Sequence, residues 1–212
     1  LHIHIAETRR EQADFQKQHG MRVVEYLDKI GVLSKNMLAA HCVWLTKGEV
    51  GLLAKAGVRV AHCPVSNMKL ASGGVAPLPE MFDAGMAVGL GTDGAASNNS
   101  LDMFETMKIC ALLHKAYRWD PTVLNAQKVL DLATIDGARA LGAEHEIGSI
   151  EVGKKADIIL VDAKTPRMVP IYSKDTVVSD LVYSASAANV DTTIVDGRVL
   201  MENREIRSLD VD

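Results

Sequence analysis

The sequence lacks long hydrophobic runs, has few cysteines and shows little excess charge. No stretch of the 212 residues approaches the roughly 18 to 20 apolar residues of a membrane-spanning helix, so no membrane partner is expected. The formal net charge is −4, without the basic stripe that is typical of nucleic-acid binders. Cys42, Cys63 and Cys110 show no paired spacing, which indicates reduced thiols and a cytoplasmic location rather than a disulfide framework.

The sequence also lacks an initiator methionine. It begins within an apolar, strand-like run at residues 1–5, which is His-rich and soon followed by charged residues, unlike a signal peptide. Because domains rarely begin in the middle of a strand, we expect the chain to be the C-terminal part of a longer polypeptide.

Short apolar runs alternate with helix-like segments up to about residue 143. The expected strands span residues 1–5, 37–41, 58–62 and 87–91. The expected helices span residues 8–33 (interrupted at residue 20), 46–57, 78–84, 101–117 and 123–141. Thr8 with Glu11, and Thr46 with Glu49, match the capping box that begins a helix. The alternation predicts parallel β/α units, either half of a (β/α)8 barrel or a doubly wound sheet.

Polar residues at the strand ends favour the barrel. His4 with Glu7, His41, His62 and Asp93 each follow one of the four predicted strands. In a barrel of this kind, the carboxyl ends of the strands carry the chemistry. Imidazole and carboxylate groups together are typical ligands of Zn²⁺ or Fe²⁺, and a carboxylate beside the metal can act as a general acid or base.

The pattern changes after about residue 143. Turn-rich residues 148–157 come first, and Asp196-Gly197 is a hairpin signal. Short β-like runs are expected at residues 158–161, 177–183, 192–195 and 199–201. We therefore predict two units, with residues 1–143 as half of a metal-dependent hydrolase barrel and residues 144–212 as a small β-sandwich segment.

Five segments carry a resemblance to a known family. They are HIAET, LAAHCVWLT, VRVAHCPVSNMKLASGGVAPL, VGLGTDGAASNNSLDMFETMK and the tail GSIEVGKKADIILVD. Together they resemble the second half of an amidohydrolase-superfamily barrel, and within it the 5-methylthioadenosine/S-adenosylhomocysteine deaminases. The resemblance covers essentially the whole chain. It implies strands 5–8 of a (β/α)8 barrel, followed by a small C-terminal β segment of the composite domain.

The resemblance implies a role for each strand-end residue. His4 matches the metal-binding His of strand 5, and Asp93 matches the strand-8 Asp that binds the metal and takes a proton from its water. Glu7 matches the Glu that shuttles protons and touches the purine ring. His41 matches the strand-6 His that orients the attacking hydroxide and the substrate. His62 lies where the family has a His near the substrate pocket, and a structural hydrogen bond is an equal alternative for it.

The motif His2-Ile3-His4 also resembles the His-x-His pair of zinc hydrolases. In the family that pair lies on strand 1, whereas the interval from His4 to Asp93 has room for only about four β/α units. We therefore expect His4 to be the strand-5 ligand and His2 to be a chance residue. The strand-1 ligands are absent from this chain, and His4 and Asp93 alone cannot complete a tetrahedral site.

These matches predict metal-dependent hydrolytic deamination of an adenine nucleoside such as 5-methylthioadenosine or S-adenosylhomocysteine, giving the inosyl product and ammonia. One divalent metal is implied, with zinc favoured and iron as the alternative. Other enzymatic alternatives are deamination of guanine or cytosine and hydrolysis of triazines. A non-catalytic half-barrel is a further alternative. An open half-barrel exposes sheet edges, so we expect the missing N-terminal half or a homo-oligomer as partner.

Other polar residues are expected to have structural roles. His19, His114 and His145 are predicted to lie at the surface, and Cys42 and Cys63 in apolar packing. Loop-shaping hydrogen bonds, rather than catalysis, are expected for Ser66, Asn67, Ser97, Asn98 and Asn99.

Overall fold

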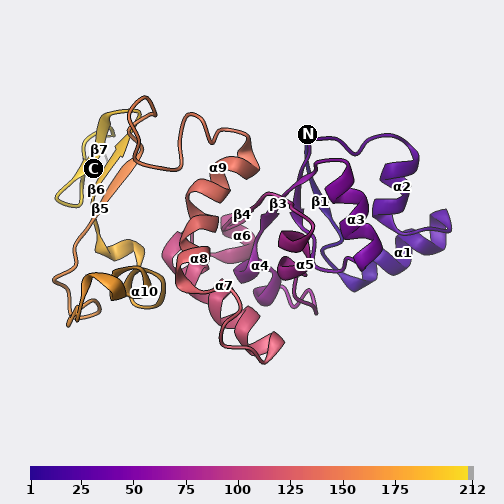
Figure 1. Ribbon diagram of the computed structural model, residues 1–212, viewed down its shortest axis with the longest axis horizontal. Coiled ribbons are helices and arrows are strands. Elements are labelled where there is room, and N and C mark those ends of the chain that lie inside the picture. The colour runs from indigo at the N-terminus through magenta and orange to yellow at the C-terminus, as the bar shows by residue number, and fades with distance from the viewer. Residues whose placement is uncertain (210–212) are drawn as a thin grey trace.

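Two four-stranded sheets organise the computed structural model, which describes residues 1–209 (Figure 1). The first sheet is parallel, with its strands in sequential order. These strands are β1 (His2–Ile5), β2 (Leu38–His41), β3 (Arg59–His62) and β4 (Val88–Leu90). Helices follow every strand, so the predicted α/β class is confirmed.

The helices around this sheet lie close to the predicted segments. After β1 come α1 (Arg9–His19) and α2 (Val23–Lys29), and after β2 comes α3 (Lys47–Lys55). After β3 come α4 (Pro64–Lys69) and α5 (Leu78–Asp83). After β4 come α6 (Ala95–Asn98), α7 (Met103–Arg118), α8 (Ala126–Ala133) and α9 (Ile135–Leu141). The short helices α4 and α6 replace the expected loops, and both lie next to strand ends.

Both predicted capping boxes are confirmed. The Glu11 backbone N–H donates to Thr8 Oγ1 over 3.0 Å, and the Thr8 N–H donates to the Glu11 carboxylate over 3.3 Å. Thr46 and Glu49 form the same reciprocal pair at the start of α3. Since these caps satisfy backbone groups that a helix start leaves unpaired, α1 and α3 can begin close to the strand ends.

The register of the first sheet sorts its side chains onto two faces. One row, packed in or against the buried core, consists of Ile3, Ala39, Val60 and Val88. The next row, on the opposite face, consists of His4, Ala40, Ala61 and Gly89. Successive residues of a strand point to opposite faces, so burying Ile3 places His4 away from the apolar row.

The second sheet has the strand order β5-β6-β7-β8 and is antiparallel. Its strands are β5 (Ile158–Val161), β6 (Val190–Val195), β7 (Arg198–Glu202) and β8 (Glu205–Ile206). Asp196 and Gly197 turn β6 into β7 with φ angles of 49° and 75°. Two positive φ angles are typical of the tight hairpin turn that the Asp-Gly pair predicts.

The strand predicted at residues 177–183 is wrong, because Val177–Tyr183 is helix α10. A single-turn helix η1 (Lys174–Thr176) precedes it, and another, η2 (Ala187–Asn189), follows. Val182 is fully buried, and α10 packs against α7 and α8. The valines favour a strand locally, but packing of one helix face against two neighbouring helices overrides that propensity.

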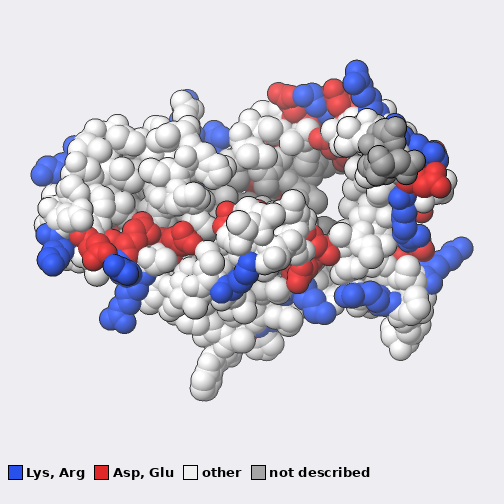
Figure 2. All heavy atoms as spheres, turned by 180° about the vertical axis from the view of Figure 1, so that it is seen from behind, with Lys and Arg blue, Asp and Glu red and all other residues white. Residues whose placement is uncertain are grey.

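The surface mixes charges of both signs. Figure 2 shows Lys and Arg interspersed with Asp and Glu on the face seen from behind. Within residues 1–209, no helix combines the length and apolar character that crossing a membrane requires.

Candidate active site

Three strand ends bring His4, His41 and Asp93 together. Each residue offers one ligand atom, and these atoms all lie within 4.8 Å of one another. The imidazole rings of His4 and His41 stack, with their centroids 5.1 Å apart. Because the strands are parallel, their carboxyl ends share one edge of the sheet, and residues distant in sequence meet there.

Glu7 lies beside this group. Its Oε2 atom is 3.6 Å from His41 Nε2, and 23% of its side chain remains exposed. The Glu11 carboxylate accepts hydrogen bonds from the backbone N–H groups of Ala6, over 2.9 Å, and of Glu7, over 2.8 Å. Glu11, which forms the capping box of α1 with Thr8, therefore also fixes the turn in which Glu7 lies beside His41.

The backbone at these strand ends is strained. Ala6, His41, Cys42 and Asp93 have φ angles of 53°, 70°, 52° and 61°. A left-handed conformation costs a residue other than glycine about 1 to 3 kcal/mol, and such residues cluster at functional sites. At His41 and Asp93, the left-handed conformation ends the extended backbone at the point where the side chains of the candidate site lie.

Two serines hold the Asp93 carboxylate. Its Oδ2 atom accepts hydrogen bonds from Ser66 Oγ on α4, over 2.7 Å, and from Ser97 Oγ on α6, over 2.8 Å. Partial burial raises the pKa of Asp93, but the bonds from Ser66, Ser97 and the Gly94 backbone outweigh it and lower this pKa. The carboxylate is therefore ionised at neutral pH, as a metal ligand or proton acceptor must be.

Asn67, also on α4, holds His41. Its Nδ2 atom lies 3.0 Å from His41 Nδ1, and both side chains are buried. Burial lowers the pKa of His41, while the charges of Glu7 and Asp93 oppose that shift. The sequence predicts loop-shaping roles for Ser66 and Asn67, and their contacts with site residues are not foreseen. The one signal in the sequence is their place four and five residues after the strand end at His62.

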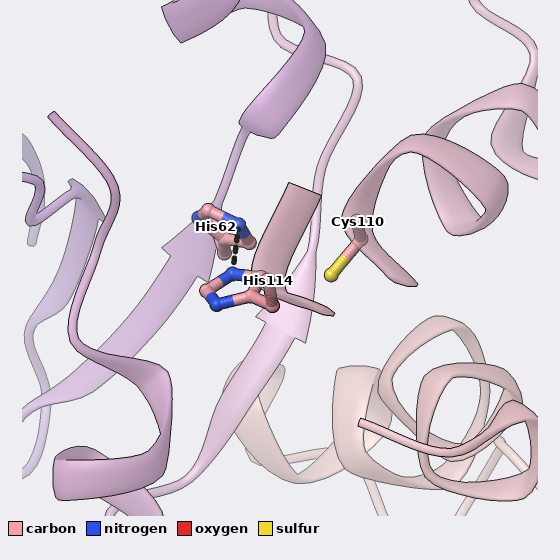
Figure 3. A group of neighbouring side chains, drawn as sticks. All are labelled: His62, Cys110 and His114. Carbon is pink, nitrogen blue, oxygen red and sulfur yellow. Dashed lines mark hydrogen bonds between the residues drawn. The ribbon is translucent and has the colours of Figure 1, made fainter. Parts of the chain in front are cut away.

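His62 contacts a different partner from the His4 group. Figure 3 shows its ring against that of His114, with the two Nε2 atoms 3.2 Å apart. The predicted surface position of His114 is wrong, because α7 turns this residue inward and buries it completely. Burial lowers the pKa of His114 to about 4 and holds the pKa of His62 well below its usual value. His19 and His145 are exposed, as predicted.

Cys110 lies one helical turn before His114 and near the same histidine pair (Figure 3). His62, Cys110 and His114 are thus a second group of side chains close enough to hold an ion. However, the two Nε2 atoms bond to each other, and burial raises the pKa of Cys110 to about 12. This arrangement favours a structural contact between β3 and α7. All three cysteines are free and buried, as expected.

The donor set of the first group suits a divalent metal. Imidazole nitrogen and carboxylate oxygen atoms bind Zn²⁺, and the same atoms suit iron. Within residues 1–209, this group supplies three such side chains, His4, His41 and Asp93. A tetrahedral site needs four ligands, so the group fits a metal without completing its coordination.

Relatives of known name match the whole chain. The chain is 51% identical over 212 residues to a 5-methylthioadenosine/S-adenosylhomocysteine deaminase of Moorella thermoacetica, covering 100% of this chain and 49% of that protein. It is 48% identical over 210 residues to a 5'-deoxyadenosine deaminase of Methanobrevibacter smithii, covering 99% and 48%. The chain therefore spans about half the length of these relatives.

Solved structures agree with these sequence matches. A zinc-bound adenosine deaminase from Xanthomonas campestris superposes with a TM-score of 0.93 at 42% identity, covering 99% of this chain and 47% of that one. A zinc complex of atrazine chlorohydrolase from Arthrobacter aurescens superposes with a TM-score of 0.90 at 28% identity, covering 100% and 46%. The sequence pattern that defines the amidohydrolase family matches residues 1–200. The chain therefore belongs to the amidohydrolase family.

Proposed function

We propose that the complete protein is a metal-dependent aminohydrolase that deaminates an adenine nucleoside such as 5-methylthioadenosine or S-adenosylhomocysteine. In this proposal, residues 1–143 are strands 5–8 of a (β/α)8 barrel with their helices. Residues 144–212 are the small C-terminal β segment of the composite domain, of which residues 210–212 lie outside the described part. The four sequential parallel strands and the half-length match to the relatives support this organisation.

One observation carries the proposal: His4, Glu7, His41 and Asp93 converge at the carboxyl ends of the first sheet. A metal-assisted hydrolysis needs metal ligands, a proton acceptor for water and a donor for the leaving group within one site. This chain supplies candidates for all three roles. His62 has a supporting role here, because His114 already occupies its Nε2 atom.

His4 and Asp93 would hold the metal, together with ligands from the missing half of the barrel. When bound, a divalent ion such as zinc lowers the pKa of water from 15.7 to about 7, which makes hydroxide available at neutral pH. Zinc in the related structures favours zinc over iron.

The protein side chains then divide the proton transfers. Asp93, which is ionised at neutral pH, accepts the proton of the attacking water. His41 donates a hydrogen bond that orients the attacking oxygen towards the purine C6 atom. The two protons of the attacking water end on the two products. Glu7, which lies 3.6 Å from His41 and partly faces solvent, carries one of them to the purine ring nitrogen, and the other passes from Asp93 to the departing amine. Ammonia and the inosyl product result.

The names of the relatives favour a nucleoside substrate. The two relatives named as adenosine-type deaminases share 51% and 48% identity with this chain, whereas the atrazine chlorohydrolase shares 28%. Guanine or cytosine deamination and triazine hydrolysis use the same metal chemistry and remain the less favoured alternatives.

Ammonia release by the complete protein tests this proposal. Candidate substrates are 5-methylthioadenosine, S-adenosylhomocysteine, 5'-deoxyadenosine, guanine and a chlorotriazine. We expect release only from the adenine nucleosides, and a loss of at least about 100-fold in kcat for Asp93→Asn, because the proton acceptor is removed. Asp14→Asn, on the exposed face of α1, is the matched control and should retain full activity. Full activity in Asp93→Asn would contradict the proposed mechanism.

The non-catalytic alternative is separated by a second measurement. Residues 1–212 alone are expected to be inactive, and addition of the N-terminal half should restore ammonia release. A complete protein that binds the nucleosides without releasing ammonia would support a binding role instead.

A further inference from the structure

His41 has two chemically different ring nitrogens, and the structure gives each a different neighbour. Nδ1 lies 3.0 Å from Asn67 Nδ2, inside the buried layer between β2 and α4. Nε2 lies 3.6 Å from Glu7 Oε2, on the side of the candidate active site. In a neutral imidazole one nitrogen carries the proton and the other a lone pair, and the partner of one nitrogen decides the state of the other.

We infer that Asn67 is a positioning residue that fixes the tautomer of His41 with the proton on Nε2. An amide nitrogen can only donate a hydrogen bond, so Nδ1 must accept it with its lone pair. The proton of the neutral ring is then left on Nε2. Asn67 is 5% exposed, so water has little access to compete for Nδ1.

The tautomer bears on whether His41 is a metal ligand or a hydrogen-bond donor, a question that distances alone leave open. His4, His41 and Asp93 all offer ligand atoms within 4.8 Å, so His41 could be a third metal ligand. An Nε2 atom that carries a proton has no lone pair for a metal, and it can only donate a hydrogen bond. The Asn67 contact therefore gives a physical reason for the hydrogen-bond donor role that the proposed function assigns to His41.

The surrounding structure holds Asn67 in place for this task. Its backbone N–H donates to Cys63 O over 3.1 Å, and its backbone C=O accepts from Ser72 over 2.9 Å. The neighbouring Ser66 holds Asp93 over 2.7 Å. One turn of α4 thus positions two site residues, His41 and Asp93, from strands that are separated in sequence.

The tautomer is a property of residues 1–212, whereas its use in catalysis rests on the proposed function. The direct test is nitrogen NMR of the complete protein with ¹⁵N-labelled histidine at neutral pH, where protonated and unprotonated ring nitrogens have distinct shifts. We expect His41 Nδ1 to be unprotonated and Nε2 to be protonated. A protonated Nδ1 would overturn the inference, since the Asn67 carbonyl would then face the ring.

Variants separate Asn67 from general effects of burial. In Asn67→Asp the carboxylate can only accept, so Nδ1 should become protonated, and an unprotonated Nδ1 would contradict the assignment. In Asn67→Ala the tautomers should mix. Asn98→Asp is the matched control, because Asn98 is 6% exposed and donates to Thr92 O without touching His41. An equal change of the His41 shifts in this control would show that Asn67 has no specific role.

Kinetics on the complete protein give an independent measure. For Asn67→Asp we expect kcat to fall by about 10- to 100-fold with little change in KM, since the altered tautomer affects the reacting geometry rather than substrate binding. A rise in KM with an unchanged kcat would contradict the positioning role. An inactive wild-type protein with the expected NMR tautomer would refute the proposed function and leave the tautomer assignment intact.

Discussion

His41 and His62 both end strands of the same sheet, yet their surroundings differ. His41 faces Glu7 and stacks on His4, whereas His62 contacts His114 in the interior. The sequence places both histidines at strand ends but does not contain the direction in which each ring points. That direction depends on the left-handed backbone at His41 and on the inward face of α7. Residue roles here follow from what each side chain contacts after folding.

The buried pair His62–His114 makes a prediction about pH at the residue scale. The pKa of His114 is about 4 when folded and about 6.5 when unfolded, so the unfolded state binds more protons as the pH falls between these values. We expect the free energy of unfolding to decrease on acidification, by about 2 kcal/mol from His114 alone between neutral pH and pH about 5. Denaturant unfolding at the two pH values measures this loss.

The histidine variants identify the source of the pH dependence. His114→Gln should reduce the loss on acidification, whereas His145→Gln, whose side chain is 92% exposed, should leave it unchanged. An unaltered pH dependence in His114→Gln would show that His114 does not titrate with the expected shift.

At the scale of elements, some helices can be predicted from local sequence signals, whereas others depend on packing against neighbouring helices. The capping boxes at α1 and α3 are readable because they join residues three positions apart. The helix α10 is not readable in this way, because its valines favour a strand until the helix packs on α7 and α8. Short helices such as α4 and α6 also escape prediction, since their few residues carry no periodic pattern. These two helices supply the hydrogen bonds to Asp93 and His41.

The start of α3 makes a prediction at this scale. Glu49 is 1% exposed, and its Oε2 atom accepts hydrogen bonds from Arg22 Nε, over 2.7 Å, and from the Thr46 backbone, over 2.8 Å. Glu49→Ala removes the cap and leaves Arg22 without its carboxylate partner, although Trp44 O still accepts a hydrogen bond from it, so we expect a loss of about 3 kcal/mol in the free energy of unfolding. The exposed pair Arg10–Asp14 is the control, and Asp14→Ala should change stability little. Equal effects of the two variants in denaturant unfolding would contradict this interpretation.

At the scale of the whole molecule, residues 1–209 supply only part of the ligand set that a tetrahedral metal site needs. The parallel sheet of the chain has β1 at one edge and β4 at the other. The candidate ligand His4 lies on β1, and the candidate ligand Asp93 follows β4. The relatives are about twice as long as this chain. A second half that pairs with both edges would enclose the ligands from both sides, which is the geometry that the proposed barrel requires.

Zinc binding makes the corresponding prediction. We expect the chain alone to bind zinc more weakly than the complete protein, because it offers too few ligands for a tetrahedral site. In the complete protein, His4→Ala should weaken binding by at least about 10-fold, measured by competition with a chromophoric chelator. His2→Ala is the matched control on the same strand and should bind zinc normally. Equal losses in both variants would mean that His2 and His4 form the ligand pair.

The sequence by itself determined the α/β class, the four strands, the capped helix starts and the strand-end residues His4, Glu7, His41 and Asp93. These features depend on neighbouring residues and on the alternation of strands and helices, both of which are visible along the chain. Only the tertiary structure decided that Ser66 and Ser97 hold Asp93, that Asn67 holds His41 and that His114 is buried. Apart from the Ser97–Asp93 bond, which spans four positions, these contacts join elements far apart in sequence, and they form once the helices have packed against the strand ends.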